Sequence, residues 1–245
     1  MIALLADIHA NREALTACLA DAERRKADRY VFLGDLVGYG ADPGWVVDRV
    51  MDYAARGAVA VLGNHDAAAA GAAVSMNETA QQAIAWTRRQ LSETQRGFLN
   101  SLPLTAADRA RLYVHASANE PDQWHYVLDG ASARDSIGAT PAHQTFCGHV
   151  HVPALYHVSL TGKLIEFTPT AGTSIPLLQG RRWLAVLGAV GQPRDHNPAA
   201  CYALLDDSKN EIVYLRVPYD TALVARKIRD AGLPGVLAAR IEQGF

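Results

Sequence analysis

The sequence predicts a layered α/β fold, in which strands and helices alternate along the chain. Within residues 1–62, short apolar runs alternate with segments of helical periodicity, in the order strand, helix, strand, helix, strand. Hydrophobic residues make up 49% of the 245 residues and charged residues 20%, which is the composition of a globular protein. A chain of this length also buries a sizeable core.

The first elements follow from caps and periodicity. A strand is expected over 2–6, and Asn11 is a suitable N-cap for the helix that follows it. A second strand over 30–33 precedes Asp42-Pro43, an N-cap followed by proline at the first helical position. A third strand is expected over 59–62.

The rest of the chain is expected to be helical at first and rich in strands over residues 145–217. A helix is expected over 78–91, and the capping box Ser92-Glu93-Thr94-Gln95 opens another. Residues 145–217 have short apolar runs and many turn residues, and we expect a mostly antiparallel region that closes a second sheet. Helices return from Asp220 onward. No break in composition divides the chain, so residues 1–245 are expected to form one domain.

Charge and hydropathy narrow the class of protein. The formal net charge of −2 offers no basic surface for a long nucleic acid, whereas a small phosphorylated substrate remains compatible. No apolar segment is long enough to span a membrane, and Asp7 and His9 interrupt the first apolar run, so no secretion signal is visible. Cys18, Cys147 and Cys201 are odd in number and widely spaced, which indicates free thiols and a cytoplasmic location.

Polar residues follow the apolar runs at several points where a strand is expected to end. They are Asp7 and His9, Asp35 after Gly34, the run Gly63-Asn64-His65-Asp66, His115 after the run 111–114, and the pair His149 and His151 after Gly148. In open α/β sheets the carboxyl ends of the strands form the ligand-binding edge. Asp, Asn and His are also the side chains that hydrolytic metal centres use.

The number of these residues favours two cations over one. Three carboxylate or amide oxygens and four imidazoles exceed the needs of one tetrahedral zinc but suit two divalent ions. Each motif alone has a structural alternative: Asp-x-His is a weak signal, Gly-Asp often marks a turn, and His115 at a strand end is often a surface or capping residue. Their joint occurrence at strand ends decides for a metal centre, and such a centre is suited to attack on phosphorus.

As a set, these motifs closely resemble the calcineurin-like metallophosphoesterase superfamily. Three further stretches, Gly38-Tyr39-Gly40, Gly191-Gln192-Pro193-Arg194-Asp195 and Ala231-Gly232-Leu233-Pro234, resemble its compact prokaryotic phosphodiesterase branch, often labelled diadenosine-tetraphosphatase-like. The resemblance implies a four-layer α+β sandwich with two mixed β-sheets packed face to face and flanked by helices. It also implies two ligand sets: Asp7, His9, Asp35 and His151 for one metal, and Asp35, Asn64, His115 and His149 for the other.

The resemblance leaves His65 outside the ligand set, beside the metals. An imidazole there could stabilise developing charge or protonate the leaving oxygen, with Asp66 orienting it, so both residues are predicted to be catalytic. The alternative is that His65 only positions Asn64.

Substrate contacts are less well defined by the sequence. Relatives that act on phosphoproteins or symmetric dinucleoside tetraphosphates follow the second motif with Asp-Arg-Gly, but residues 36–40 contain no arginine. Arg194 could grip phosphate instead, or form a surface salt bridge. Asn11 could reach the leaving oxygen, although its role as an N-cap competes. Trp124 and Tyr126 could stack on a base or sugar, or simply pack within their loop.

We therefore expect a metal-dependent phosphoesterase that hydrolyses small phosphodiesters or phosphomonoesters by attack of a metal-bound hydroxide on phosphorus. Two divalent ions are implied, with Mn²⁺ the first choice and Fe, Zn²⁺, Ni²⁺ or Co²⁺ also compatible. A nuclease of the same superfamily and a non-catalytic scaffold are the alternatives.

Overall fold

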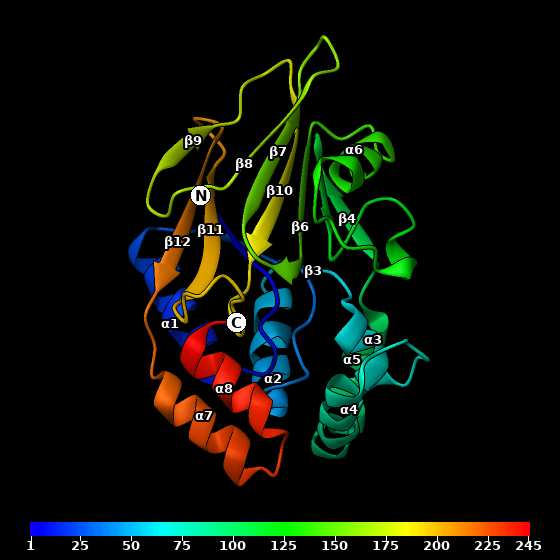
Figure 1. Cartoon of the computed structure of the whole chain (residues 1–245), viewed down its shortest axis with the longest axis vertical. Coiled ribbons are helices and arrows are strands. Elements are labelled where there is room, and N and C mark those ends of the chain that lie inside the picture. Colours follow the sequence, from blue (N-terminus) through cyan, green and yellow to red (C-terminus); the bar gives the residue numbers. More distant parts are fainter.

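Two six-stranded sheets pack face to face in the computed structural model, which describes residues 1–245, and helices flank them on the outside (Figure 1). The first sheet has the strand order β3-β2-β1-β11-β12-β9 and the second β4-β5-β6-β10-β7-β8. Both contain parallel and antiparallel pairs. The predicted sandwich of two mixed sheets with flanking helices is confirmed.

The strands are β1 (Ile2–Leu5), β2 (Arg29–Phe32), β3 (Val59–Ala60), β4 (Thr105–Asp108), β5 (Arg111–Val114), β6 (Gln144–His151), β7 (Ala154–Val158), β8 (Leu164–Phe167), β9 (Ser174–Pro176), β10 (Arg182–Gly188), β11 (Ala200–Asp206) and β12 (Glu211–Val217). The helices are α1 (Arg12–Arg24), α2 (Pro43–Ala54), α3 (Asn64–Ala70), α4 (Glu78–Gln90), α5 (Glu93–Ser101), the 3₁₀ turn η1 (Pro121–Gln123), α6 (Gly130–Gly138), α7 (Thr221–Asp230) and α8 (Gly235–Gln243).

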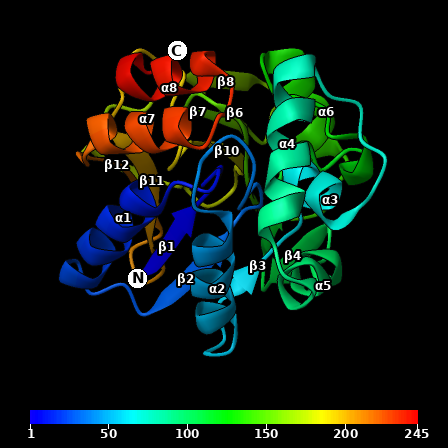
Figure 2. The ribbon, with the colours of Figure 1, turned by 90° about the horizontal axis from the view of Figure 1, so that it is seen from below.

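Three apolar clusters hold the layers together. The cluster between the sheets includes Leu4 from β1, Phe146 from β6 and Tyr214 from β12. A second cluster joins α1 and α2 to the outer face of the first sheet, and a third joins α6 to the outer face of the second. Helices α7 and α8 pack on each other and form part of a further cluster with α4 (Figure 2). No helix is both long and apolar enough to cross a membrane.

Parallel strands bring the predicted site residues to one edge. Strands β1, β2 and β3 run parallel in the first sheet, and β5, β6 and β10 run parallel in the second. Because the sheets face each other, loops from both of them meet at the carboxyl ends of these strands. The six parallel strands thus explain how segments distant in sequence converge.

Most predicted helices are confirmed. Asn11 caps α1 through a hydrogen bond from the Ala14 amide, and Ser92 with Gln95 forms the predicted capping box of α5. Asp42 precedes α2 as expected but makes no capping hydrogen bond, because its carboxylate binds Lys227 instead. The three cysteines are buried and free.

The expectation for residues 145–217 is corrected in one respect. Strands β11, β12 and β9 extend the first sheet, while β6, β7, β8 and β10 belong to the second. Strand β11 is buried along nearly its whole length, which suits a central position beside β1. Helix α6 and strand β4 were not predicted from the sequence.

A half-buried carboxylate connects α1 to the first sheet. Asp21 accepts hydrogen bonds from Tyr202 (2.7 Å), Arg25 (2.8 Å) and Arg24 (2.9 Å). Burial opposes ionisation, but these donors outweigh it and hold the pKa of Asp21 below its ordinary value.

Asp21→Asn should therefore destabilise the protein by about 1–2 kcal/mol near pH 7, since charged hydrogen bonds are lost. Because the pKa of Asp21 is lower in the folded state, its ionised carboxylate stabilises the folded protein above about pH 4, the pKa of an unfolded aspartate. This stabilisation is lost as the pH falls through the folded-state pKa. Urea unfolding should thus show the variant and wild type converging towards pH 3. Asp52→Asn, at an exposed carboxylate, is the control and should change little. An equal deficit at both pH values would contradict this account.

Candidate metal centre

Seven predicted side chains converge and are almost completely removed from solvent. None is more than 8% exposed: Asp7, His9, Asp35, Asn64, His115, His149 and His151. Three overlapping groups of three side chains have potential ligand atoms within 4.8 Å of one another, and in one of them His65 joins His9 and Asp35. Burying this many polar groups is costly unless they are paired or hold a cation.

Left-handed backbone conformations recur at the predicted ligands. Strand β1 ends at Leu5, and both Asp7 (φ 54°) and His9 (φ 48°) lie in the left-handed region. Asp35, His149 and His151 do so as well, with φ between 51° and 69°. Left-handed backbone at these positions therefore sets the direction of the side chains in the Asp-x-His and His-x-His pairs. Such conformations cost about 1–3 kcal/mol each and tend to cluster at functional sites.

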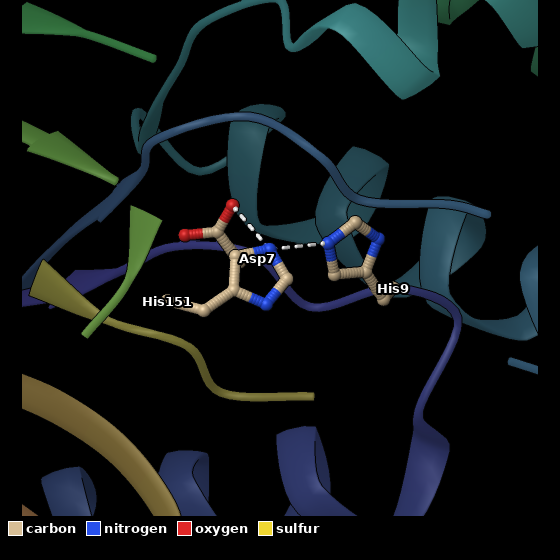
Figure 3. Close-up of side chains that lie close together, drawn as sticks. All are labelled: Asp7, His9 and His151. Atoms are coloured by element: carbon tan, nitrogen blue, oxygen red, sulfur yellow. Dashed lines mark hydrogen bonds and ion pairs between the residues drawn. The ribbon is translucent and has the colours of Figure 1, made fainter. Parts of the chain in front are cut away.

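The first group joins the end of β1 to the end of β6. The Nε2 atoms of His9 and His151 lie 3.0 Å apart, and His151 Nε2 is 3.5 Å from Asp7 Oδ1 (Figure 3). The Asp7 carboxylate is itself fixed by the His149 amide, which donates to both of its oxygens at 3.1 and 2.9 Å. One carboxylate and two imidazoles thus point at a common centre.

The second group lies beside the first and shares Asp35 with it. His115 Nε2 is 3.2 Å from Asn64 Oδ1, 3.1 Å from His149 Nδ1 and 3.3 Å from Asp35 Oδ2. The same Asp35 oxygen is 3.7 Å from His9 Nε2. Asp35 Oδ2 therefore stands between the two groups, and its other oxygen accepts a hydrogen bond from the His65 amide at 2.9 Å.

The histidine tautomers fit bound cations. The Nδ1 atoms of three histidines each face a backbone carbonyl: His9 faces Val37 (3.2 Å), His115 faces Leu33 (2.7 Å) and His151 faces Gln192 (2.6 Å). A carbonyl can only accept, so Nδ1 carries the proton and Nε2 is left with the lone pair. The facing Nε2 atoms of His9 and His151 have no proton to share, and a cation would satisfy both. His149 presents Nδ1 instead.

Charge at the cluster is unevenly distributed. Burial raises the pKa of Asp7 to about 7 and, with repulsion from His115, lowers that of His149 to about 3. Burial also acts to lower the pKa of His115, but Asp35 and Asp7 overcome it and raise that pKa to about 9. The two carboxylates thus favour positive charge at His115, which is the charge that a cation held by its Nε2 would supply.

Two glycines allow the carboxylates of Asp35 and Asp7 to lie close to the backbone. A Cβ atom on Gly63 would lie 2.2 Å from the Asp35 amide nitrogen and from Asp35 Oδ1, and one on Gly148 would lie 2.5 Å from Asp7 Oδ2. Both carboxylates are therefore packed against backbone that has no room for a side chain.

His65 and Asp66 lie at the site in different ways. The His65 ring packs against Tyr39, with centroids 4.4 Å apart, and its Nδ1 is buried without a partner. Asp66 does not orient it as expected: its carboxylate accepts from the amides of Val37 (3.1 Å) and Gly63 (3.2 Å). These bonds tie the loops after β2 and β3 together, so a direct partnership between Asp66 and His65 is not found.

The two residues predicted to contact substrate, Asn11 and Arg194, have different surroundings. Asn11 is fully engaged, since it caps α1 and donates to the Gly191 carbonyl (2.9 Å) and the Tyr219 hydroxyl (3.3 Å), and it is only 1% exposed. These contacts favour the N-cap role of Asn11, and a substrate contact by this residue stays a prediction. Arg194 is half-buried, makes no salt bridge, and lies over the Tyr39 ring.

Sequence reasoning assigned no role to Tyr39. Its ring lies 4.6 Å from that of His9 and 4.4 Å from that of His65. The available signal was its place in Gly38-Tyr39-Gly40, four residues after Asp35, although the motif alone does not reveal which way the ring points.

The fold and the buried Asp/His cluster together define a metallophosphoesterase architecture. The model of the calcineurin-like phosphoesterase superfamily domain matches residues 1–210, so the chain belongs to that metal-dependent superfamily, as its motifs predicted.

Solved structures and relatives agree. The structure of a metallophosphoesterase from Sphaerobacter thermophilus is 35% identical with a TM-score of 0.88, covering 100% of this chain and 98% of that one. An uncharacterized protein of Methanocaldococcus jannaschii is 32% identical over 100% of this chain and 98% of its own length. A putative diadenosine tetraphosphatase shares the fold at 16% identity and a TM-score of 0.51, over 89% of this chain and 93% of that chain.

Gly63→Ala should displace Asp35 and weaken metal binding about 10–100-fold, as for residues that support a metal ligand. We expect it also to lose about 1–3 kcal/mol of stability through overpacking. Gly97→Ala, on the exposed face of α5 with open space around it, is the matched control and should gain up to about 1 kcal/mol with metal content unchanged. Metal analysis after dialysis and thermal unfolding report both effects. Full metal content in Gly63→Ala would refute the packing argument.

Proposed function

We propose that this protein hydrolyses small phosphodiesters or phosphomonoesters at a two-metal centre, with residues 1–245 acting as one domain. The position of Asp35 carries the proposal, because one of its oxygens faces imidazoles of both groups at 3.3 and 3.7 Å. That arrangement is suited to a carboxylate shared by two ions. Asp7, His9, Asp35 and His151 would hold one ion, and Asp35, Asn64, His115 and His149 the other.

Two divalent cations, with Mn²⁺ the first choice, would activate water as the nucleophile and neutralise the phosphoryl oxygens. The protein supplies alignment and exclusion of water. Carbonyl partners fix the rings of His9, His115 and His151, and burial removes competing solvent from the ligand atoms.

Arg194 is proposed as the phosphate-gripping cation. Its backbone amide donates to the His151 carbonyl (3.3 Å), and its guanidinium lies 5.9 Å from the centroid of the Tyr39 ring. One nitrogen donates to Gln192, and Nε is buried without a partner. A guanidinium with a free donor beside the metal groups is suited to a bidentate contact with phosphate. It would stand in for the arginine that is missing after Asp35.

A phosphoester panel on Mn²⁺-loaded protein tests the reaction. We expect turnover of p-nitrophenyl phosphate, bis(p-nitrophenyl) phosphate or thymidine 5′-p-nitrophenyl phosphate. Asp35→Asn, which removes the shared charge, should lower kcat/KM by about 1,000-fold or more. Asp52→Asn is the exposed control. If wild type is no faster than Asp35→Asn on any ester, the enzyme proposal fails and the scaffold alternative gains.

His65 is proposed to act on the reacting group, beside the metals. Burial lowers its pKa, so the neutral imidazole predominates at pH 7. A neutral ring can donate its N–H to charge that develops on the phosphoryl or leaving oxygen, which supports the first of the two roles considered above. Asp66 is proposed to serve catalysis indirectly, by holding the loop from which His65 projects.

His65→Ala should keep both metals and lower kcat by about 100- to 10,000-fold, the usual contribution of a positioned imidazole. Metal analysis and steady-state kinetics on the same preparation separate the two effects. His143→Ala, an exposed histidine at the opposite end of β6, is the control and should behave as wild type. Full activity in His65→Ala would remove the role, and loss of one metal would make His65 a ligand, as its place in a group with His9 and Asp35 permits.

A further inference from the structure

A second feature opens directly beside the metal groups. It is a cleft of about 540 Å³ between the chain that follows α3 and the loop 117–128, and Asn64 and His149 lie at its inner end. Small-molecule sites are commonly of this size. We call it the aromatic cleft, because Trp124 and Tyr126 line it.

Both aromatic rings rest on predicted metal ligands. Tyr126 stacks on His149, with centroids 3.9 Å apart and planes at 24°. Trp124 meets His115 edge-on, with centroids 5.9 Å apart. Tyr126 is 49% exposed and Trp124 is half-buried, so each ring retains surface that faces the cleft. A rigid aromatic platform therefore begins where the metal groups end.

The loop is built to hold these rings in place. Its base is closed by the Ser117 amide, which donates to the His125 carbonyl at 3.0 Å. The short turn η1 is flanked by Glu120 (φ 49°) and Trp124 (φ 56°), both in the left-handed region although neither is glycine. Strain of this kind in non-glycine residues persists where the surroundings over-determine it, often at ligand sites. Simple loop packing does not account for an exposed tyrosine stacked on a buried histidine.

The charge of the cleft restricts what it can bind. Asp122 is its one acidic side chain, and no lysine or arginine lines it. A chain of additional phosphates would find no cation there, which disfavours dinucleoside polyphosphates. A flat, uncharged heteroaromatic group fits instead, because every base offers a π-face for stacking. Asp122 can accept a hydrogen bond from an exocyclic amine or a sugar hydroxyl.

We propose that the aromatic cleft binds the nucleobase of a phosphoester with a single phosphate, so that the substrate is a nucleotide ester. This inference rests on the proposed function, since the phosphate must occupy the metal groups for the base to reach Trp124 and Tyr126. Trp124 and Tyr126 are then specificity residues and contribute to binding in preference to the chemical step.

Calorimetry on Mn²⁺-loaded protein tests the cleft without requiring turnover. Adenosine 5′-monophosphate and ribose 5-phosphate carry the same phosphate and sugar and differ only in the base. We expect wild type to bind adenosine 5′-monophosphate about 10- to 100-fold more tightly, the range that base stacking supplies. Trp124→Leu and Tyr126→Leu should lose most of that preference while the affinity for ribose 5-phosphate stays within about 2-fold. Trp124→Phe and Tyr126→Phe keep a ring and should keep most of it.

Several results would overturn the proposal. One is that wild type binds the two ligands with equal or undetectable affinity. Another is that the leucine variants keep the preference for the base, and a third is that they lose affinity for both ligands alike. The last would mean that the loop only supports His115 and His149. Hydrolysis of these monoesters during the titration is checked by assaying released phosphate, and the comparison is repeated in the His65→Ala background, where turnover is expected to be slow and both metals kept. An inactive ester panel then contradicts the reaction alone, and a missing base preference contradicts the cleft alone. Tyr126→Leu, at a half-exposed ring, keeps the test available if Trp124→Leu does not fold.

Discussion

The shared carboxylate of Asp35 is the interaction on which the rest of the site depends. It is 1% exposed and faces His9 on one side and His115 on the other. It also accepts a hydrogen bond from the His65 amide. A carboxylate in such a place is stable only with positive charge or hydrogen-bond donors around it. Burial opposes ionisation, yet His115 and His65 hold the pKa of Asp35 well below its ordinary value. Both sheets must therefore deliver donors to one point, which explains why the parallel strands of each end there.

Backbone conformation supplies the precision that the sheets alone lack. The strands bring the loops close together. The direction of each side chain then depends on the left-handed backbone at Asp7, Asp35 and His149. Asp and His tolerate this region better than most residues. The cost is offset by interactions that form only in the folded state, such as the His149 amide on Asp7. Gly63 and Gly148 complete the arrangement by leaving no side chain between strand and carboxylate.

The residues brought together at the metal groups could be predicted because short stretches of sequence identify them, as polar residues at the ends of apolar runs. The helices with clear caps, such as those after Asn11 and Ser92, were predictable for the same reason. The partners of Asp66 were not, because they lie on Val37 and Gly63, and only tertiary structure brings Val37 within reach. Strand β4 has the weak strand sequence Thr-Ala-Ala-Asp and depends on pairing with β5, while α6 begins with glycine and gains stability from the Asp129 cap and packing on β10. Periodicity detects neither.

The two sides of the centre carry different side chains, and under the proposed function this difference would orient a ligand. Arg194 and Tyr39 adjoin His9 and His151, so the free guanidinium donor lies on the side of the first group. Trp124 and Tyr126 adjoin His115 and His149 on the other side, where no arginine or lysine is present. A phosphoester placed across Asp35 would direct its charged oxygens towards Arg194 and one substituent into the aromatic cleft. Under the proposed function, recognition of phosphate and recognition of the substituent would fall to different loops. Since Tyr126 stacks on His149 and Trp124 meets His115, a substituent bound there would also press on two predicted metal ligands, which couples its identity to the geometry of the centre.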